Sequence, residues 1–155
     1  MKQLIAIVLF ACIFQFIINI QVRKSTAKSS LSSLMKQKEL TTNQFLESKN
    51  KEYIARMQDD GNFVLYSKGA TNGRGKDNPT WASNSNGKGK GPYRVVMQED
   101  GNLVLYDADN KPTWASNTNG KGTGPYRVVM QDDGNLVVYD SKNSPTWASN
   151  TYKKK

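Results

Sequence analysis

Histidine is absent from the sequence, and cysteine occurs once, at Cys12. Without histidine the chain has no Ser-His or Cys-His nucleophilic pair, and it lacks a common ligand of zinc. Cys12 lies inside an apolar run, so the remainder of the chain has no cysteine with which to form a disulfide. These absences exclude the common hydrolase triads and zinc centres. They also require packing alone to stabilise the domain.

A long apolar run extends from Leu4 to Ile20 and follows a single positive residue, Lys2. This is the layout of a secretory signal peptide. The run is also near the lower length limit for a membrane-spanning helix. Small residues at Ser25 and Ala27 offer a cleavage point. We therefore expect a signal peptide over residues 1–27 and a secreted, extracellular protein, with an uncleaved N-terminal membrane anchor as the alternative.

Positive charge exceeds negative charge: 22 Lys and Arg residues stand against 13 Asp and Glu residues, a formal net charge of +9. Such an excess raises nucleic acids and anionic surfaces as partners. The basic residues are scattered through expected loops, apart from the run at 153–155, and no basic stripe is interleaved with aromatic residues. We interpret the charge as favouring solubility and weak anion attraction, and we expect no nucleic-acid partner.

One nine-residue pattern occurs three times, at 58–66, 98–106 and 131–139. Alternate side chains share one face of a strand, so every second residue of each copy belongs to one face. The apolar residues between them then face the core. Four hydrogen-bonding groups around an aliphatic patch suit a polyol ligand. The three candidate sites are the first (Gln58, Asp60, Asn62, Val64, Tyr66), the second (Gln98, Asp100, Asn102, Val104, Tyr106) and the third (Gln131, Asp133, Asn135, Val137, Tyr139).

Each copy also predicts a β-hairpin, because a short turn bearing Asp-Gly or its equivalent joins two β-rich runs. A second string, Pro-Thr-Trp-Ala-Ser-Asn, follows each copy and places Trp81, Trp114 and Trp147 33 residues apart. A fixed period indicates a repeated unit whose apolar face is buried by its neighbours. Three units favour closure around a pseudo-threefold axis, near which the tryptophans would meet and supply much of the core.

The pattern Gln-x-Asp-x-Asn-x-Val-x-Tyr resembles the mannose-binding motif of the monocot-type, or bulb-type, lectins, which have fish, slime-mould and bacterial relatives. The resemblance extends over residues 30–152 and implies an all-β fold. This fold is the β-prism II, with three antiparallel four-stranded sheets around a pseudo-threefold axis and one site per sheet. It also implies a bulb-type lectin domain over residues 28–155. That domain would open with a short strand and turn within 34–47, where a helix is the alternative.

The resemblance further assigns a role to each side chain of the motif. In the second site, Asp100 and Asn102 would hold the axial 2-hydroxyl of mannose, Gln98 the 3-hydroxyl and Tyr106 the 4-hydroxyl, with Val104 beneath the ring. Plain turn chemistry explains Asp-Gly-Asn, but it does not explain the recurring Gln, Val and Tyr. A calcium loop is a poor match, because its remaining ligands are missing at the required spacing.

We therefore predict a non-catalytic, calcium-independent, mannose-binding lectin that recognises mannose-rich glycans without a metal or cofactor. A lectin-fold interaction or antibacterial protein, acting without sugar, is the alternative. An enzyme is not expected, because acidic neighbours such as Asp59 and Asp60 point to opposite faces of an extended segment and do not flank one glycosidic bond. A homodimer is left open, and membrane contact is expected only with an uncleaved N-terminal segment.

The N-terminal segment provides a direct test of this expectation. Cleavage after the small residues Ser25 and Ala27 would make Lys28, or a close neighbour, the first residue of the mature chain. N-terminal sequencing of protein from the culture medium should therefore read from this position. A chain that begins at Met1 and sediments with membranes would instead support the anchor.

Overall fold

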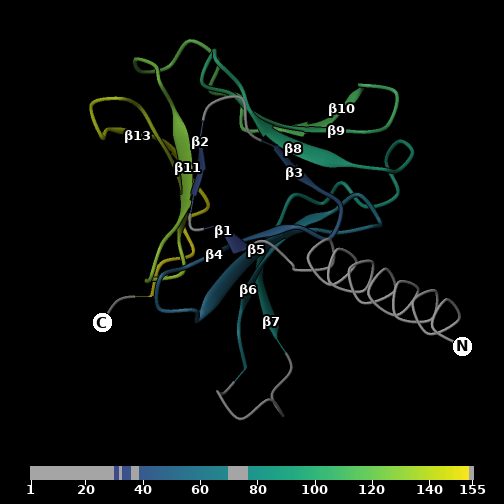
Figure 1. Ribbon diagram of the computed structural model, residues 1–155, viewed down its shortest axis with the longest axis horizontal. Helices are drawn as coiled ribbons and strands as arrows, with labels where there is room; N and C mark the ends of the chain where they lie inside the picture. The colour runs from purple at the N-terminus through teal and green to yellow at the C-terminus, as the bar shows by residue number, and fades with distance from the viewer. Residues whose placement is uncertain (1–29, 32, 36–38, 70–76, 154–155) are drawn as a thin grey trace, which may run out of the picture.

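Thirteen strands form three sheets in the computed structural model, which describes residues 30–31, 33–35, 39–69 and 77–153. The predicted signal or anchor segment at 1–27 lies outside these residues. The sheets surround a central axis like the sides of a triangle (Figure 1). The strands are β1 (Ser30–Leu31), β2 (Ser33–Met35), β3 (Glu39–Thr41), β4 (Phe45–Glu47), β5 (Tyr53–Met57), β6 (Phe63–Ser67), β7 (Asn78–Ala82), β8 (Arg94–Met97), β9 (Leu103–Tyr106), β10 (Pro112–Ala115), β11 (Arg127–Met130), β12 (Leu136–Tyr139) and β13 (Pro145–Ala148).

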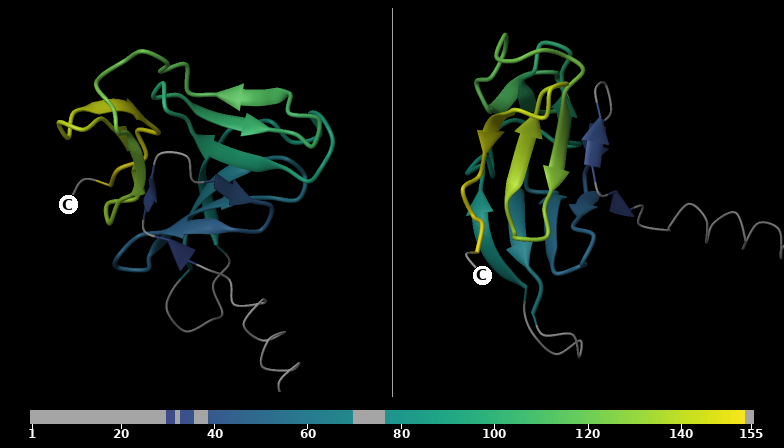
Figure 2. Two further views of the ribbon diagram at one scale, coloured as in Figure 1. Left: turned by 45° about the horizontal axis from the view of Figure 1, so that its top comes forward. Right: turned by 90° about the vertical axis from the view of Figure 1, so that its left-hand side faces the viewer.

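The sheets follow the repeat, with strand orders β1-β4-β5-β6-β7, β10-β9-β8-β3 and β13-β12-β11-β2. The predicted all-β prism is therefore confirmed, and two of its sheets have the expected four strands. The first sheet has a fifth strand, because β1 pairs with β4 in parallel. Figure 2 shows the third sheet face-on, with β2 beside β11.

The segment that precedes the first motif supplies at least one strand to every sheet. β2 pairs with β11 in the third sheet, β3 pairs with β8 in the second, and β4 pairs with β5 in the first. The expectation of short strands here is thus correct, and the helical alternative is wrong. Because these strands are consecutive in the chain, their pairing ties the three repeats together around the axis.

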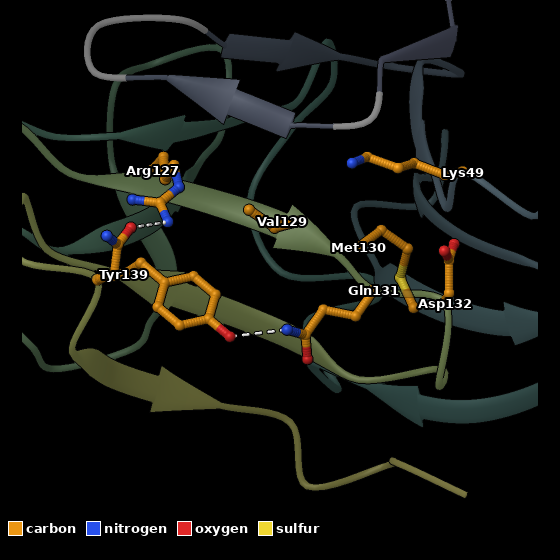
Figure 3. A pocket seen from close by; sticks show the side chains of 8 residues that line it. Lys49, Arg127, Val129, Met130, Gln131, Asp132 and Tyr139 are labelled. Atoms are coloured by element: carbon orange, nitrogen blue, oxygen red, sulfur yellow. Dashed lines mark hydrogen bonds between the residues drawn. The ribbon is translucent and has the colours of Figure 1, made fainter.

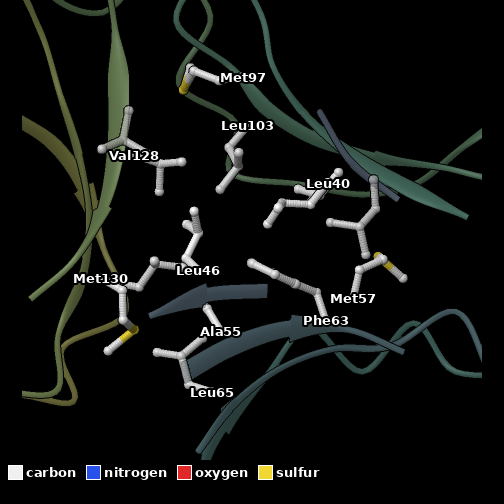
Figure 4. Packing of buried hydrophobic residues seen from close by; sticks show 14 of the residues in the cluster. Leu40, Leu46, Ala55, Met57, Phe63, Leu65, Met97, Leu103, Val128 and Met130 are labelled. Carbon is white, nitrogen blue, oxygen red and sulfur yellow. The ribbon is translucent and has the colours of Figure 1, made fainter. Parts of the chain in front are cut away.

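The core lies where the inner faces of the three sheets meet. Leu40, Leu46 and Val128 come from different sheets and point toward the same central space (Figure 4). Aliphatic, Met and Phe side chains fill this space. The apolar residues that alternate with the motif are all at most 1% exposed, as the period of two predicts: Phe63, Leu65, Leu103, Leu105, Leu136 and Val138.

The three tryptophans meet, as the 33-residue period predicts. Their ring centroids are 5.5, 5.6 and 5.7 Å apart, and each pair is arranged edge to face. This is a favourable geometry for aromatic pairs. All three remain partly exposed and pack against the main cluster. They therefore border a core that is mostly aliphatic, whereas the sequence suggested that they would supply much of it.

The glycine of each motif joins neighbouring repeats. Gly101 has a φ of +89°, and a Cβ added to it would lie 2.8 Å from the ring of Tyr126. The same contact occurs between Gly61 and Tyr93, while Gly134 packs against Tyr53. Each tyrosine is buried and lies at or directly before the start of a strand of the neighbouring repeat. Only glycine satisfies both the backbone conformation and this close approach.

Substitution of Gly101 separates these two requirements. Gly120→Ala is the matched control, because Gly120 also has a positive φ, +74°, but has no atom within 4 Å of an added Cβ. The control should lose about 1–2 kcal/mol of unfolding free energy from the left-handed backbone. Gly101→Ala should lose about 1–3 kcal/mol more, because the methyl group displaces Tyr126. Equal losses in urea denaturation would show that the tyrosine contact contributes nothing.

Candidate functional site

Each motif folds as a hairpin around a three-residue loop. In the second copy, the backbone N–H of Gln98 donates to the carbonyl oxygen of Asn102 at 2.9 Å. The backbone N–H of Gly101 in turn donates to the carbonyl oxygen of Gln98 at 3.3 Å. A turn closed by a left-handed glycine is a common hairpin geometry. It places Asp100 beside the start of the strand that carries the remaining motif residues. The structure thus brings all the predicted side chains of each site together.

Glutamine and tyrosine are joined by a hydrogen bond in every site. The Nε2 atom donates to the tyrosine hydroxyl at 2.7 Å in the first site, 2.6 Å in the second and 2.7 Å in the third. Figure 3 shows this bond between Gln131 and Tyr139. The tyrosine oxygen accepts here, so its own proton is available to a ligand. The glutamine Oε1 atom is likewise available as an acceptor.

The aspartate of each site is oriented by the asparagine that follows it. Its Oδ1 atom accepts the backbone N–H of that asparagine at 2.9 Å in all three copies. This local bond is the usual Asx turn. It occupies one of the two carboxylate oxygens with a backbone hydrogen bond. The other oxygen of an exposed Asp60, Asp100 or Asp133 can accept a ligand hydroxyl.

The asparagine side chain is fixed by residues that follow the last strand of its own repeat. In the second site, Asn102 Oδ1 accepts from the Ser116 hydroxyl at 3.0 Å and from the Thr118 backbone N–H at 3.2 Å. Asn62 and Asn135 have matching partners. The sequence suggested that this amide would both donate to and accept from a ligand. The structure uses the carbonyl oxygen internally, which leaves the NH₂ group as a donor.

These hydroxyl residues were missed by the sequence reasoning. Their signal was a hydroxyl residue two positions after the serine of the Pro-Thr-Trp-Ala-Ser-Asn string. In the second site, Ser116 also accepts the N–H of Leu103, and Thr118 donates to the carbonyl oxygen of Gly101. The string therefore supports the site as well as placing the tryptophan. The supporting pairs are Ser83 and Ser85, Ser116 and Thr118, and Ser149 and Thr151.

The motif valines offer less surface than expected. Val64, Val104 and Val137 are 4%, 3% and 3% exposed. Each valine lies between the asparagine and the tyrosine of its motif. That tyrosine is also hydrogen-bonded to the glutamine of the motif. A sugar ring would thus touch only a narrow strip of valine. Most of the affinity would have to come from the polar groups.

Arginine supports the tyrosine in the second and third sites. The guanidinium carbon of Arg127 lies 4.9 Å from the ring centroid of Tyr139, and Nη2 donates to Asn143 Oδ1 at 2.6 Å. Arg94 has the same stacking distance from Tyr106. Such cation–π contacts are favourable. The recurring Tyr-Arg-Val-Val-Met string was the signal for this pair, but the sequence reasoning gave it no role.

The third site opens into a cleft of about 680 Å³, whose lining includes Arg127, Val129, Gln131 and Tyr139 (Figure 3). Lys49, from the loop between β4 and β5, lies at its edge. A second cleft, of about 660 Å³, is lined by residues that include Asp133 and Lys153.

The β4–β5 loop is fastened to the third site by Asn50. Its backbone N–H donates to Asp132 Oδ1 at 2.9 Å, and its Nδ2 atom donates to the Asp132 carbonyl oxygen at 3.0 Å. The exposed aspartate of this motif thereby has a structural role, linking the first and third repeats.

Asp140 organises the turn that carries Asn143. Its buried carboxylate accepts the backbone N–H of Ser144 at 2.8 Å and that of Lys142 at 2.9 Å, and it also accepts from Thr123 at 3.3 Å. The Ser144 bond, aided by the bonds from Thr123 and Lys142, lowers the pKa of Asp140 below the ordinary value of 3.8, against the opposing effect of burial. The ionised carboxylate thus holds the asparagine against the arginine that stacks on the site tyrosine.

Among the residues that the structure describes, no group of three or more acidic, cysteine or histidine side chains is placed to hold a metal ion. No helix in the same described ranges is long and apolar enough to cross a membrane.

Comparisons with known proteins agree with this geometry. Residues 82–155 match the family described as D-mannose binding lectin. A monomeric monocot mannose-binding lectin from Gastrodia elata superposes with a TM-score of 0.65 and 38% identity, over 79% of this chain and 99% of that one. The chain belongs to the bulb-type mannose-binding lectin family. The snowdrop (Galanthus nivalis) member, solved with methyl-α-D-mannoside, gives a TM-score of 0.61 and 36% identity over 79% of this chain and 99% of that chain.

The sequence match to a curated member of the family is shorter. A mannose-specific lectin from Aloe arborescens is 40% identical over 72 residues, which are 46% of this chain and 56% of that protein. The chain thus matches little more than half the length of this relative. The relatives named here are described as lectins and indicate no enzymatic family.

The lowered pKa of Asp140 predicts a specific acid sensitivity. The folded-state pKa lies below the unfolded one, so the ionised carboxylate stabilises the protein above about pH 4. This stabilisation is lost as the pH falls through the folded-state pKa. Asp140→Asn should therefore be less stable than the parent at pH 7 and should lose less stability between pH 5 and pH 2.

Thermal melts across this pH range measure the effect. Asp109→Asn is the control, because it removes the same charge from an exposed side chain of the equivalent turn in the second repeat. Identical pH profiles for the parent and Asp140→Asn would contradict a stabilising ionised carboxylate.

Proposed function

We propose that this protein is a non-catalytic, calcium-independent lectin that binds mannose and mannose-rich glycans through its three motif sites. One observation carries the proposal: the same side chains make the same hydrogen bonds in all three sheets. Stability alone does not require three outward-facing copies of a polar cluster. The mannoside complex of the snowdrop relative supports the same ligand class.

Each site offers a mixed set of donors and acceptors. The free aspartate oxygen accepts, the asparagine NH₂ group donates, the glutamine Oε1 atom accepts, and the tyrosine hydroxyl donates. Sugar hydroxyls do both, so adjacent hydroxyls on one edge of a ring can pair with this set. An axial 2-hydroxyl between Asp100 and Asn102 would separate mannose from glucose, in which that hydroxyl is equatorial.

Affinity for a single sugar should be low. Four or five hydrogen bonds contribute about 0.5–1.5 kcal/mol each, and the nearly buried valine adds little. After the cost of association, binding in the sub-millimolar to millimolar range is expected. Three sites on one rigid domain raise the effective concentration on a dense glycan. The arrangement therefore favours mannose-rich surfaces and polymers over free sugar.

Neither a metal nor a catalytic step is needed for this recognition. The four polar side chains can reach sugar hydroxyls directly, and one carboxylate oxygen of each site is already held by the backbone. Adjacent acidic residues such as Asp59 and Asp60 belong to one turn, so they do not straddle a glycosidic bond. Binding without hydrolysis follows from this placement.

The asparagines permit a sharp test of the three sites. Asn102→Asp keeps the oxygen that accepts from Ser116 and Thr118, but it replaces the donor NH₂ with an oxygen beside Asp100. The fold should survive, while the second site should weaken by about 1–3 kcal/mol, or about 5- to 150-fold. Asn62→Asp and Asn135→Asp make the same change elsewhere. Asn119→Asp, on an exposed loop, is the charge-matched control.

Calorimetric titration with mannose gives the readout. The parent and Asn119→Asp should bind at three sites, each single site variant at two, and the triple variant at none. Added EDTA should leave these values unchanged. A folded triple variant that still binds mannose would refute the motif assignment, whereas loss of parent binding in EDTA would refute calcium independence.

A further inference from the structure

The three sites differ in where positive charge lies. In the third site, Arg127 lies opposite Tyr139 in the strand register, and Val129 lies opposite the motif valine, Val137. The second site has the same arrangement on β8 and β9. In both, the arginine stacks on the tyrosine and an apolar side chain lies beside the motif valine. In both sites the guanidinium group therefore lies beside the tyrosine and not beside the motif valine.

In the first site, the arginine and the apolar residue have exchanged places. On β5, Ile54 lies opposite Tyr66, and Arg56 lies opposite Val64. The sequence shows the same exchange, with Tyr-Ile-Ala-Arg-Met before the first motif and Tyr-Arg-Val-Val-Met before the others. The positive charge thus moves by two residues along the same face, from the tyrosine to the motif valine.

Arg56 has fewer partners than the arginines of the other sites. Its Nε atom is buried and has no hydrogen-bond partner. Its guanidinium carbon lies 5.8 Å from the ring centroid of Phe45, the cross-strand neighbour. By contrast, Arg127 donates both to a backbone carbonyl oxygen and to Asn143. An N–H group that is buried without a partner is costly. Arg56 as a whole is only partly buried, so its terminal guanidinium N–H groups, and not the buried Nε, are the donors that an anion could reach.

The position of Arg56 points to a ligand. Val129, its counterpart in the third site, lines the 680 Å³ cleft. Arg56 lies on β5 two residues before Gln58, which directly follows that strand, so both side chains belong to the outer face. The nearby carboxylate of Glu47 is already ion-paired with Lys68. Asp60 has an equivalent in every site, so Arg56 is the difference in charge at the position opposite the motif valine.

We propose that the first site binds mannose residues that carry an anionic ester, phosphate or sulfate, while the other two bind neutral mannose. A guanidinium group presents several N–H donors in a plane and pairs well with tetrahedral oxyanions. The motif residues would hold the ring, and Arg56 would contact the ester. This inference rests on the proposed mannose-binding function and adds a second ligand class to one of its sites.

A variant with only the first site intact tests the proposal. In the full chain with Asn102→Asp and Asn135→Asp, mannose 6-phosphate should bind about tenfold more tightly than mannose at low salt, since a charged hydrogen bond contributes more than a neutral one. Mannose 6-sulfate distinguishes the two esters, and inorganic phosphate measures anion binding without sugar. The preference should shrink as salt screens the charge.

Substitutions then assign the preference to the arginine. Arg56→Val, which restores the residue type of the other sites, should remove it. Lys121→Val, which removes one exposed charge from a loop, should keep it. In the converse variant, Asn62→Asp and Asn102→Asp leave only the third site intact. There, Val129→Arg should create the preference for mannose 6-phosphate over mannose.

The outcomes separate this inference from the proposed function. Equal affinities for mannose and mannose 6-phosphate, or a preference that survives Arg56→Val, would overturn the inference. So would inorganic phosphate that binds as tightly as the sugar phosphate. If the first site alone binds neither sugar while the parent binds mannose, the inference fails and the proposed function stands for the second and third sites only. If the parent binds neither, the proposed function fails as well.

Discussion

The left-handed glycine at the end of each motif turn is the constraint on which both the fold and the sites depend. At Gly101 it closes the three-residue loop that sets Asp100 beside Asn102, and its bare Cα lets Tyr126 of the neighbouring repeat pack against it. One residue thereby fixes the geometry of a candidate site and the contact between two repeats. Because all three copies do this, the closed triangular arrangement and the three polar clusters form together.

A second dependence runs from the tryptophan string to the site. Trp114 joins the edge-to-face cluster near the axis, and two and four residues later Ser116 and Thr118 hold the carbonyl oxygen of Asn102. The last strand of each repeat thus anchors the fold through its tryptophan, and the residues directly after that strand orient a candidate ligand-binding amide. Because Trp114 is so close in the chain to Ser116 and Thr118, packing of the tryptophan also positions the residues that hold Asn102. The site side chains are then in place before a ligand binds, which lowers the entropy lost on binding.

Much of the fold and of the candidate sites could be predicted because the sequence is periodic. The alternation around Leu103 and Leu105 gave the inner face, and the 33-residue period gave the tryptophan cluster. What could not be predicted depends on contacts between segments distant in sequence. The use of the Asn102 carbonyl oxygen by Ser116, the fifth strand beside β4, and the loop of Asn50 fastened to Asp132 all arise from such contacts. Departures from the period, such as Arg56 in place of a valine, were visible in the sequence but acquired meaning only from the strand register.

The central claim is that the motif side chains, and not the tryptophans, contact the sugar. Two-dimensional ¹⁵N NMR during a mannose titration tests it directly, because both kinds of side chain carry observable N–H groups. The structure predicts that the NH₂ signals of Asn62, Asn102 and Asn135 shift with the sugar concentration, while the indole signals of the three tryptophans stay in place. Indole signals that shift while the asparagine signals remain fixed would contradict the claim.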